Sequence, residues 1–304
     1  MQYSFYTADV FTQQIFGGNP LAVFPQAGGL SETQMQAIAG EFNLSETAFV
    51  LPPETPQGTA RLRIFTPRTE LPFAGHPTVG TACVLATAGR LPLNEGEAQV
   101  VLEEGVGPVR VDIRAGAGQP LFARLWAARL PEFGPPPPSN AELAAMLSLE
   151  PEDLLEGRYA PEAVSCGGPF LFVPLASLEA LGRARVVQSL WERTLSGYWA
   201  TEVYLLTFET GESRAGLRAR MFAPAMGIGE DPATGAAATA IAGYLGKRQE
   251  AAGGLLRWTI AQGVEMGRPS LLEVEADCSG GEIRAIRVGG SAVLVSQGTM
   301  EVPG

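Results

Sequence analysis

Residues 63–85, RIFTPRTELPFAGHPTVGTACVL, decide the fold, because their pattern returns at residues 220–245, RMFAPAMGIGEDPATGAAATAIAGYL. Each copy opens with an apolar segment, passes through a turn that contains proline and glycine, and continues into a run of small uncharged residues. Aligning Glu70 with Glu230 also aligns the prolines and glycines of the two turns. The chain therefore carries two copies of one strand–turn–helix unit.

Segments upstream of the two copies match in the same order. Residues 17–20, Gly-Gly-Asn-Pro, precede LAVF, and residues 167–169, Gly-Gly-Pro, precede FLFV. Each half then has a predicted helix, the first beginning near Ser31 with a capping-box pattern and the second containing SLWERTL. A predicted strand follows in each half, ETAFVL at 46–51 and EVYLLT at 202–207. These matches predict two α/β lobes of similar topology, related by approximate twofold symmetry; the alternative is that similar patterns arose independently.

The boundary between the predicted lobes lies in a proline-rich stretch. Residues 131–138, PEFGPPPP, can form neither a helix nor a central strand, because proline lacks the amide hydrogen and fixes φ. We therefore expect an N-terminal lobe over residues 1–130 and a C-terminal lobe over residues 131–304, joined by this linker. The tail from about residue 284 is predicted to form two alternating strands, IRAIRV and SAVLVSQG, which could return to the N-terminal lobe.

Both copies of the repeat predict a buried helix that begins at a glycine-containing turn. Residues 78–88 and 235–245 consist mainly of small or apolar residues and carry no charge, so we expect one central helix inside a sheet in each lobe. A buried helix start leaves backbone amides with partial positive charge, and two such ends could hold a small carboxylate in a cleft between the lobes. The alternative is that these are ordinary buried helices capped by local turns.

The composition limits the possible partners and compartments. The chain has 304 residues, of which 46% are hydrophobic, and its net charge of −11 argues against nucleic acid or an anionic membrane surface as a partner. No stretch reaches the ~20 apolar residues that a membrane span needs, and the start MQYSFYTADVF lacks the basic region of a signal peptide. The three isolated cysteines form neither a disulfide framework nor a metal-binding spacing. We expect a cytoplasmic protein.

His76 is the only histidine of the chain. A zinc or iron site built on several imidazoles is therefore excluded. A Ser-His-Asp hydrolase would have to use His76 as its base, and no G-x-S-x-G motif accompanies it. Neither a strand-linked G-x-G-x-x-G nor a Walker A loop is present, so nicotinamide chemistry is disfavoured.

Five motifs in order resemble the phenazine-biosynthesis PhzF-like proteins: FTQQIFGGNPLAVF, NLSETAFV, RIFTPRTELPFAGHPTVGTA, GEDPATGAAATA and QGVEMGRPS. The resemblance extends over nearly the whole chain. It implies an α+β fold of the diaminopimelate-epimerase type, with two pseudo-symmetric lobes, each a sheet wrapped around a central helix. It also implies a homodimer and a cofactor-independent isomerase, which moves a proton within a small unsaturated cyclic carboxylate similar to dihydro-hydroxyanthranilate.

The resemblance also assigns roles to individual residues. Glu46 matches the acid–base residue, which takes a proton from one carbon and returns it to another. Desolvation raises the pKa of a glutamate in a dry cleft, so one group can accept and then donate a proton. His76 and Asp231 match further catalytic residues that line the substrate. The predicted substrate-binding residues are Asn19, Gly75, Thr234, Gly235 and Ala236.

The sequence departs from the family at one of these positions. The family's motif commonly continues DPATGS, whereas Ala236 stands at the serine position here. The missing hydroxyl removes a hydrogen bond typically worth about 0.5–1.5 kcal/mol, which puts the particular substrate in doubt but leaves the reaction class. Epimerases of this fold use two facing cysteines at the helix starts. The corresponding segments FAGHP and DPATG contain none, so a two-thiol racemase is disfavoured.

Each candidate residue also has a purely structural interpretation. Glu46 could pair or cap at a strand edge, His76 could form structural hydrogen bonds beside a helix start, and Asp231 could N-cap its helix. Glu202, the counterpart of Glu46 in the other half, is the rival base. Two other functions stay open: a lyase that eliminates water or ammonia from a similar carboxylate, and a catalytically silent dimeric protein that binds small molecules.

Overall fold

A computed structural model describes residues 1–116, 118–211, 215–249 and 253–303. The chain divides into two compact units, of which unit 1 comprises residues 1–128 and 288–304 and unit 2 comprises residues 129–287. The predicted range 131–304 for the second lobe differs from unit 2 at its C-terminal end, because the last strand pairs with the first strand of the chain. Among the described residues, no helix is long and apolar enough to cross a membrane.

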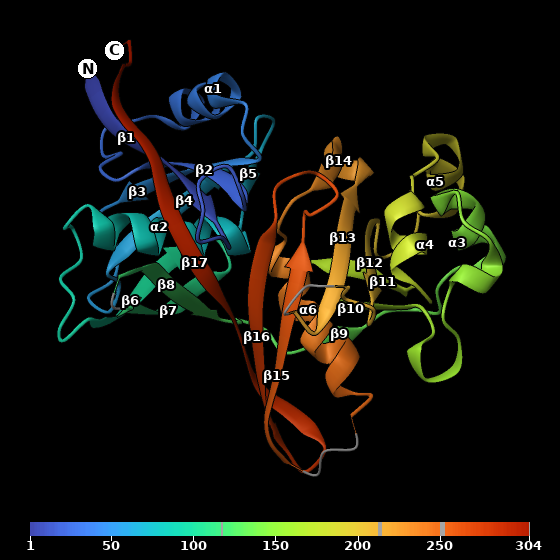
Figure 1. Cartoon of the computed structure of the whole chain (residues 1–304). Helices are drawn as coiled ribbons and strands as arrows, with labels where there is room; N and C mark the ends of the chain where they lie inside the picture. The colour runs from blue at the N-terminus through green and yellow to red at the C-terminus, as the bar shows by residue number, and fades with distance from the viewer. Residues whose placement is uncertain (117, 212–214, 250–252, 304) are drawn as a thin grey trace. The chain divides into compact units, whose positions relative to one another are not determined.

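Unit 1 is built from strands that surround one helix. Its elements are β1 (Gln2–Val10), β2 (Asn19–Phe24), α1 (Glu32–Phe42), β3 (Glu46–Leu51), β4 (Ala60–Phe65), β5 (Glu70–Leu71), α2 (Gly75–Thr87), β6 (Glu97–Glu104), β7 (Gly107–Gly116), β8 (Gln119–Trp126) and the second part of β17 (Glu282–Glu301). The pairings β17–β1–β2–β3–β4–β6–β7–β8 close on themselves, because β8 also pairs with β17. Figure 1 shows β17 running beside β1.

Helix α2 lies inside this ring of strands. It contacts β1, β2, β3, β7 and β8, and all its residues from Gly75 to Leu85 are buried. Small residues make this possible, because a Cβ at Gly80 would lie 2.5 Å from a Val10 methyl group. The helix ends at Thr87, and Gly89 follows in the left-handed conformation at φ 67°, as its C-terminal position predicts.

Unit 2 repeats the same order of strands and adds helices. Its elements are β9 (Glu132–Phe133), α3 (Asn140–Leu147), β10 (Glu162–Ser165), β11 (Pro169–Pro174), α4 (Leu178–Arg183), α5 (Gln188–Thr194), β12 (Glu202–Thr207), β13 (Leu217–Ala223), β14 (Ile228–Asp231), α6 (Gly235–Gly246), β15 (Gly253–Gln262) and β16 (Ser270–Ser279), with short 3-10 turns at Pro151–Asp153, Gly157–Tyr159 and Pro224–Met226. Helix α6 is buried along most of its length and contacts β10, β11 and β16.

The two units share a strand register. In unit 1, β2 and β3 are parallel and Leu21 stands opposite Glu46; in unit 2, β11 and β12 are parallel and Phe170 stands opposite Glu202. The next, antiparallel pairs also correspond, with Thr47 opposite Phe65 in unit 1 and Val203 opposite Phe222 in unit 2. The repeated sequence segments therefore occupy equivalent places in two similar sheets.

Local sequence signals set several element ends. Ser31 and Ser139 each begin a helix with a full capping box, in which the serine side chain accepts from the third helical amide and that residue's side chain returns the bond. Strands β3 and β12 have the predicted ends. The tail differs from expectation, because the two predicted strands are one continuous strand, β17. Its Gly289 packs so close to β8 that a Cβ would lie 2.7 Å from the carbonyl oxygen of Ala123.

Candidate active site

Glu46 is the first residue of β3 and only 8% of its surface is exposed. Strand β3 is flanked by β2 on one side and β4 on the other, so Glu46 does not lie on a sheet edge. Glu46 is therefore not an edge residue, and whether its role is structural or catalytic stays a prediction. A buried carboxyl group at the end of a central strand is costly unless a neighbouring polar group stabilises it.

The imidazole of His76 provides that neighbour. His76 is the second residue of α2, is 4% exposed, and places its Nε2 atom 3.2 Å from Oε2 of Glu46. The pair forms because the FAGHP turn starts α2 beside the beginning of β3. Both residues are predicted catalytic residues, and the structure brings them together.

Asn19 fixes the orientation of the imidazole from its other side. It is the first residue of β2, is fully buried, and its Nδ2 lies 3.3 Å from Nδ1 of His76. When the amide donates to Nδ1, the ring proton is on Nε2, the nitrogen that lies 3.2 Å from Oε2 of Glu46, although these two atoms are not in hydrogen-bond geometry. Burial lowers the pKa of His76 to about 3, so the ring is neutral at physiological pH. Asn19, His76 and Glu46 thus form one buried polar row.

The start of α2 adds backbone donors next to this row. Ala74 occupies the N-cap position and has no side chain that can cap the helix. Gly75 is the first helical residue and is buried, and Pro77 has no amide hydrogen to satisfy. The amides of the first turn therefore carry the partial positive charge of a helix start without a side-chain cap.

A second polar cluster lies in unit 2. Asp231 ends β14, is 8% exposed, and accepts a hydrogen bond of 2.5 Å at Oδ2 from Oγ1 of Thr234. Thr234, not Asp231, is the N-cap residue of α6, so the structural interpretation of Asp231 as the cap is wrong. Gly235 and Ala236 are the first two residues of that helix, which places Ala236 at the position that His76 occupies in α2.

Gln262, which the sequence analysis did not name, holds this cluster together. Its Nε2 lies 2.8 Å from the carbonyl oxygen of Asp231 and 3.0 Å from Oγ1 of Thr234. Its Oε1 accepts from the amide of Thr234 at 3.2 Å and from the hydroxyl of Tyr204 at 3.1 Å. Gln262 begins the motif QGVEMGRPS, so the signal for it was present in the sequence.

Glu202 has the environment of a buried acid without an imidazole. It is 5% exposed, and burial raises its pKa to about 7 against the opposing bond from Thr201 at 3.3 Å. A carboxyl group with this pKa could also exchange protons near neutral pH. Burial alone therefore does not distinguish the rival base from Glu46.

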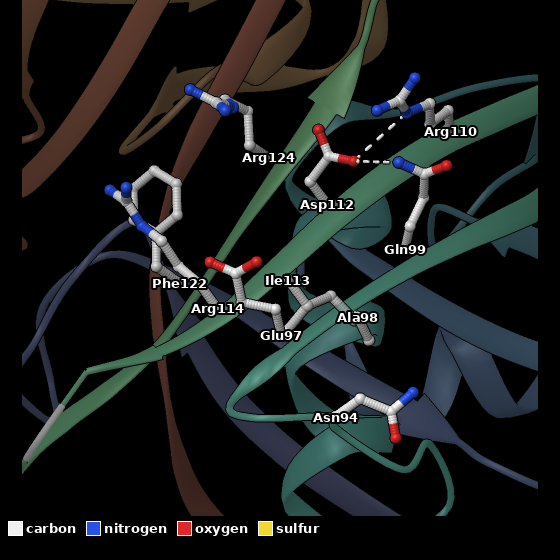
Figure 2. Close-up of a pocket in the computed structure, with 10 residues that line it drawn as sticks. All are labelled: Asn94, Glu97, Ala98, Gln99, Arg110, Asp112, Ile113, Arg114, Phe122 and Arg124. Carbon is white, nitrogen blue, oxygen red and sulfur yellow. Dashed lines mark hydrogen bonds and ion pairs between the residues drawn. The ribbon is translucent and has the colours of Figure 1, made fainter.

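A cavity of about 520 Å³ lies over β6, β7 and β8, and none of the predicted site residues lines it. Figure 2 shows Asp112 accepting from Gln99 and Arg110, at 2.9 and 3.2 Å. Partial burial raises the pKa of Asp112, but these bonds and one from Trp126 outweigh it and hold the pKa below its usual range. Two of the lining arginines stack on aromatic rings, Arg110 at 4.2 Å from the ring centre of Trp126 and Arg114 at 4.1 Å from that of Phe122.

Comparisons with known proteins agree with the predicted family. A family model for phenazine biosynthesis-like proteins matches residues 8–298. The chain is 41% identical over 295 residues to an uncharacterized isomerase of Mesorhizobium japonicum, covering 96% of each protein. It is 34% identical over 298 residues to trans-2,3-dihydro-3-hydroxyanthranilate isomerase of Pseudomonas chlororaphis, covering 96% of this chain and 97% of that protein.

A solved structure shows the same fold. The crystal structure of a PhzF-family protein of Bacillus anthracis matches with a TM-score of 0.89 at 25% identity, covering 99% of this chain and 100% of that one. The family and the enzyme class predicted from the sequence are therefore confirmed. The chain belongs to the phenazine biosynthesis-like family and is an isomerase.

Proposed function

We propose that this isomerase shifts a proton within a small unsaturated cyclic carboxylate similar to trans-2,3-dihydro-3-hydroxyanthranilate, with Glu46 as the acid–base group. The relative from Pseudomonas chlororaphis carries that substrate in its name. The observation that carries the role of Glu46 is its 3.2 Å approach to Nε2 of His76 in a buried position. A carboxyl group held at a fixed place and shielded from water suits proton transfer to and from carbon.

The reaction needs one group that first accepts and then donates. Glu46 as carboxylate takes a proton from a saturated ring carbon, and the electron pair of that C–H bond moves into the neighbouring unsaturated system. The double bonds shift, and the carboxylic acid of Glu46 returns the proton to a different carbon. Atoms and charge balance without a co-reactant. General acid–base catalysis of this kind contributes about 10²–10⁴-fold.

The neighbouring groups support these two steps. The neutral imidazole of His76 places Nε2 3.2 Å from Oε2 of Glu46, close enough for its polar edge to stabilise the carboxylate form without a full charge, although the two atoms are not in hydrogen-bond geometry. The contact of 3.3 Å between Nδ2 of Asn19 and Nδ1 of His76 favours the tautomer protonated at Nε2 when the amide is the donor. The uncapped amides at the start of α2 are suited to a carboxylate group of the substrate.

We infer that the two units descend from one duplicated sequence and that only unit 1 kept the catalytic pair. The shared register places Glu202 where Glu46 stands. Ala236 stands where His76 stands, so Glu202 has a methyl group at the place of the imidazole. This difference favours Glu46 as the base. Contributions of Asp231, Thr234, Gly235 and Ala236 to the same substrate, and the homodimer, stay predictions.

Proton NMR in D₂O with the purified protein and trans-2,3-dihydro-3-hydroxyanthranilate tests the proposal. We expect rearrangement with deuterium at a ring carbon and no change of mass other than that exchange. A product lighter by water or ammonia would replace the isomerase by the lyase alternative. Neither rearrangement nor slow exchange of a ring hydrogen would contradict this substrate class.

A further inference from the structure

Glu104 lies at the position in unit 1 that Gln262 holds in unit 2. Strand β6 runs parallel to β4 with Arg61 opposite Glu103, and β15 runs parallel to β13 with Arg218 opposite Ala261. Glu104 and Gln262 are the next residues, and each ends its strand.

The glycines that follow confirm this correspondence. Gly105 and Gly263 both pass directly over the proline of the turn that starts the central helix. A Cβ on Gly105 would lie 2.8 Å from Cα of Pro72, and a Cβ on Gly263 would lie 2.5 Å from the carbonyl oxygen of Pro232. Glu104 is therefore the counterpart of the residue that braces the helix start in unit 2.

The hydrogen bonds of Glu104 show what it does there. Its Oε1 lies 2.7 Å from the hydroxyl of Thr78, and that hydroxyl also lies 2.8 Å from the carbonyl oxygen of Ala74, the N-cap of α2. A carbonyl oxygen only accepts, and the hydroxyl has one hydrogen to give. With Glu104 as a carboxylate, the hydroxyl donates to its Oε1 and the carbonyl oxygen of Ala74 keeps, among the described residues, only the Thr78 amide, at 3.3 Å. With Glu104 as a carboxylic acid, Thr78 can donate to Ala74 and accept from Glu104, so that both short contacts are hydrogen bonds.

The surroundings of Glu104 favour the same protonation state. The residue is 8% exposed, and among the described residues its Oε2 has no hydrogen-bond partner. Burial raises its pKa to about 8, although the Thr78 bond acts in the opposite direction. The titratable groups on the strands and the helix around it are Glu46 of β3, Arg61 and Arg63 of β4, Glu70 of β5, Glu97 and Glu103 of β6, Arg110, Asp112 and Arg114 of β7, and His76 and Cys83 of α2.

The basic groups of that set are directed elsewhere. Arg61 pairs with Glu54, and Arg63 pairs with Glu32 and Glu70. Arg110 lies beside Asp112 and over the ring of Trp126.

We propose that Glu104 is a positioning residue, which as a neutral carboxylic acid braces Thr78 and Ala74 and so keeps the start of α2 open to an anionic ligand. A neutral glutamine does the corresponding work in unit 2. A carboxylate in this place would neutralise the positive end of the helix and repel a second anion. The part that concerns the substrate rests on the proposed function, whereas the protonation of Glu104 does not.

Thermal unfolding against pH tests the protonation without any substrate. Folded Glu104 keeps a proton that unfolded Glu104 releases above its ordinary pKa of about 4.5, so its contribution favours folding at low pH and is lost as the pH rises to about 8. The melting temperature of Glu104→Gln should therefore rise relative to wild type by at least about 3 °C between pH 5 and pH 8.5. Parallel profiles would overturn the proposal.

Steady-state kinetics test the effect on the ligand. With trans-2,3-dihydro-3-hydroxyanthranilate, the KM of the wild type should rise about tenfold from pH 7 to pH 9, following ionisation near pH 8. Glu104→Gln should lack this rise of KM with pH, because its amide cannot ionise. Titration of the substrate itself affects both proteins equally. The same dependence of KM on pH in the wild type and in Glu104→Gln would show that ionisation of Glu104 does not affect ligand binding. A wild type that turns over nothing would contradict the proposed function, and the unfolding profiles would still decide the state of Glu104.

Discussion

Glu46 and Glu202 occupy the same register position in two similar sheets, yet His76 lies 3.2 Å from Glu46 while Ala236 stands at the equivalent helix position in the other unit. Both glutamates are buried at the start of a central strand. The backbone therefore places the two carboxyl groups in equivalent positions. The two sites differ in the second residue of the central helix, which is His76 in unit 1 and Ala236 in unit 2. An imidazole can stabilise and orient a carboxylate, whereas a methyl group cannot.

This relationship supplies a matched pair of variants for the catalytic base. Glu46→Gln should lower kcat by about 10²–10⁴-fold with little change of KM, because the amide is nearly isosteric but cannot transfer the proton. Glu202→Gln should stay near wild-type activity, since the change has the same chemistry at the equivalent position. Turnover and deuterium incorporation with trans-2,3-dihydro-3-hydroxyanthranilate measure both. The reverse order of effects would identify Glu202 as the base.

Because the chain has one histidine, NMR can measure the protonation state and tautomer of His76 in the row formed with Asn19 and Glu46. In untagged protein labelled with ¹⁵N-histidine, both ring nitrogens belong to His76. We expect the shifts of a neutral ring protonated at Nε2, unchanged from pH 8 to pH 5, because burial lowers the pKa to about 3. Asn19→Ala should mix the tautomers. A ring that becomes charged near pH 6.5 would contradict the buried neutral state.

The same pKa makes a prediction about acid stability. The unfolded chain binds a proton at His76 below about pH 6.5, whereas the folded chain does not until about pH 3. Stability from this residue is therefore fully present above pH 6.5 and is lost as the pH falls towards 3. The free energy of unfolding of His76→Gln should fall less between pH 6.5 and pH 3 than that of the wild type. Urea unfolding of both proteins at pH 7 and pH 4.5 measures this. An equal fall in the free energy of unfolding for both proteins would argue against a lowered pKa of His76.

Two equivalent arginines should differ in their effect on stability. Arg220 is 4% exposed, pairs with both carboxylate oxygens of Glu230 at 2.8 Å, and donates to the carbonyl oxygens of Leu181 and Ala184. Its counterpart Arg63 has a side chain that is 15% exposed and pairs with Glu70 and Glu32, whose side chains are 37% and 73% exposed. Arg220→Met should cost about 3–5 kcal/mol, because it leaves buried acceptors without a donor.

The matched change in unit 1 provides the comparison. Arg63→Met should cost only about 1 kcal/mol or less, because water can replace the lost partner at the surface. Urea unfolding of both variants in one buffer measures the difference. Similar losses for both would show that burial does not set the energy of these pairs.

Gly263 should tolerate no side chain. Its φ is +74°, and a Cβ would lie 2.5 Å from the carbonyl oxygens of both Pro232 and Arg268. Gly263→Ala should therefore cost about 2 kcal/mol or more and disturb the bonds that Gln262 makes. Gly267 has a similar φ of +71° with no atom within 4 Å, so Gly267→Ala isolates the backbone cost, about 1 kcal/mol. Unfolding measurements that rank the two variants equally would show that the close contact costs nothing.

Local signals were enough for much of the fold. The repeat and the strand patterns predicted β3 and β12 with their observed ends, and the capping-box pattern at Ser31 predicted the start of α1. These features depend on residues close in sequence. The tail was different, because Gly289 breaks the apolar alternation and looks like a turn. Its role is to let β17 approach β8, a contact between segments that are far apart along the chain.

The sequence predicted which residues belong to the candidate site but not how their side chains are arranged. Glu46, His76 and Asn19 were named from motifs, but no motif specifies that the imidazole faces Glu46 on one side and Asn19 on the other. Gln262 and Glu104 were missed because the repeat was followed only as far as its helices. The short segments EEGV at 103–106 and AQGV at 261–264 extend it, and only the strand register makes their correspondence plain.

The pairing of β17 with β1 has a consequence for the order in which the chain folds during synthesis. The ribosome completes β1 early, but the partner strand emerges only after the whole of unit 2 has been made. Unit 2 is continuous in sequence and can fold as it is synthesised. Until β17 is made, the edge of β1 that pairs with β17 stays unpaired and could pair with a wrong strand. In chains stalled just after residue 287, we expect unit 2 to resist protease while residues of unit 1 are still cleaved. The ring of strands around α2 is then closed last.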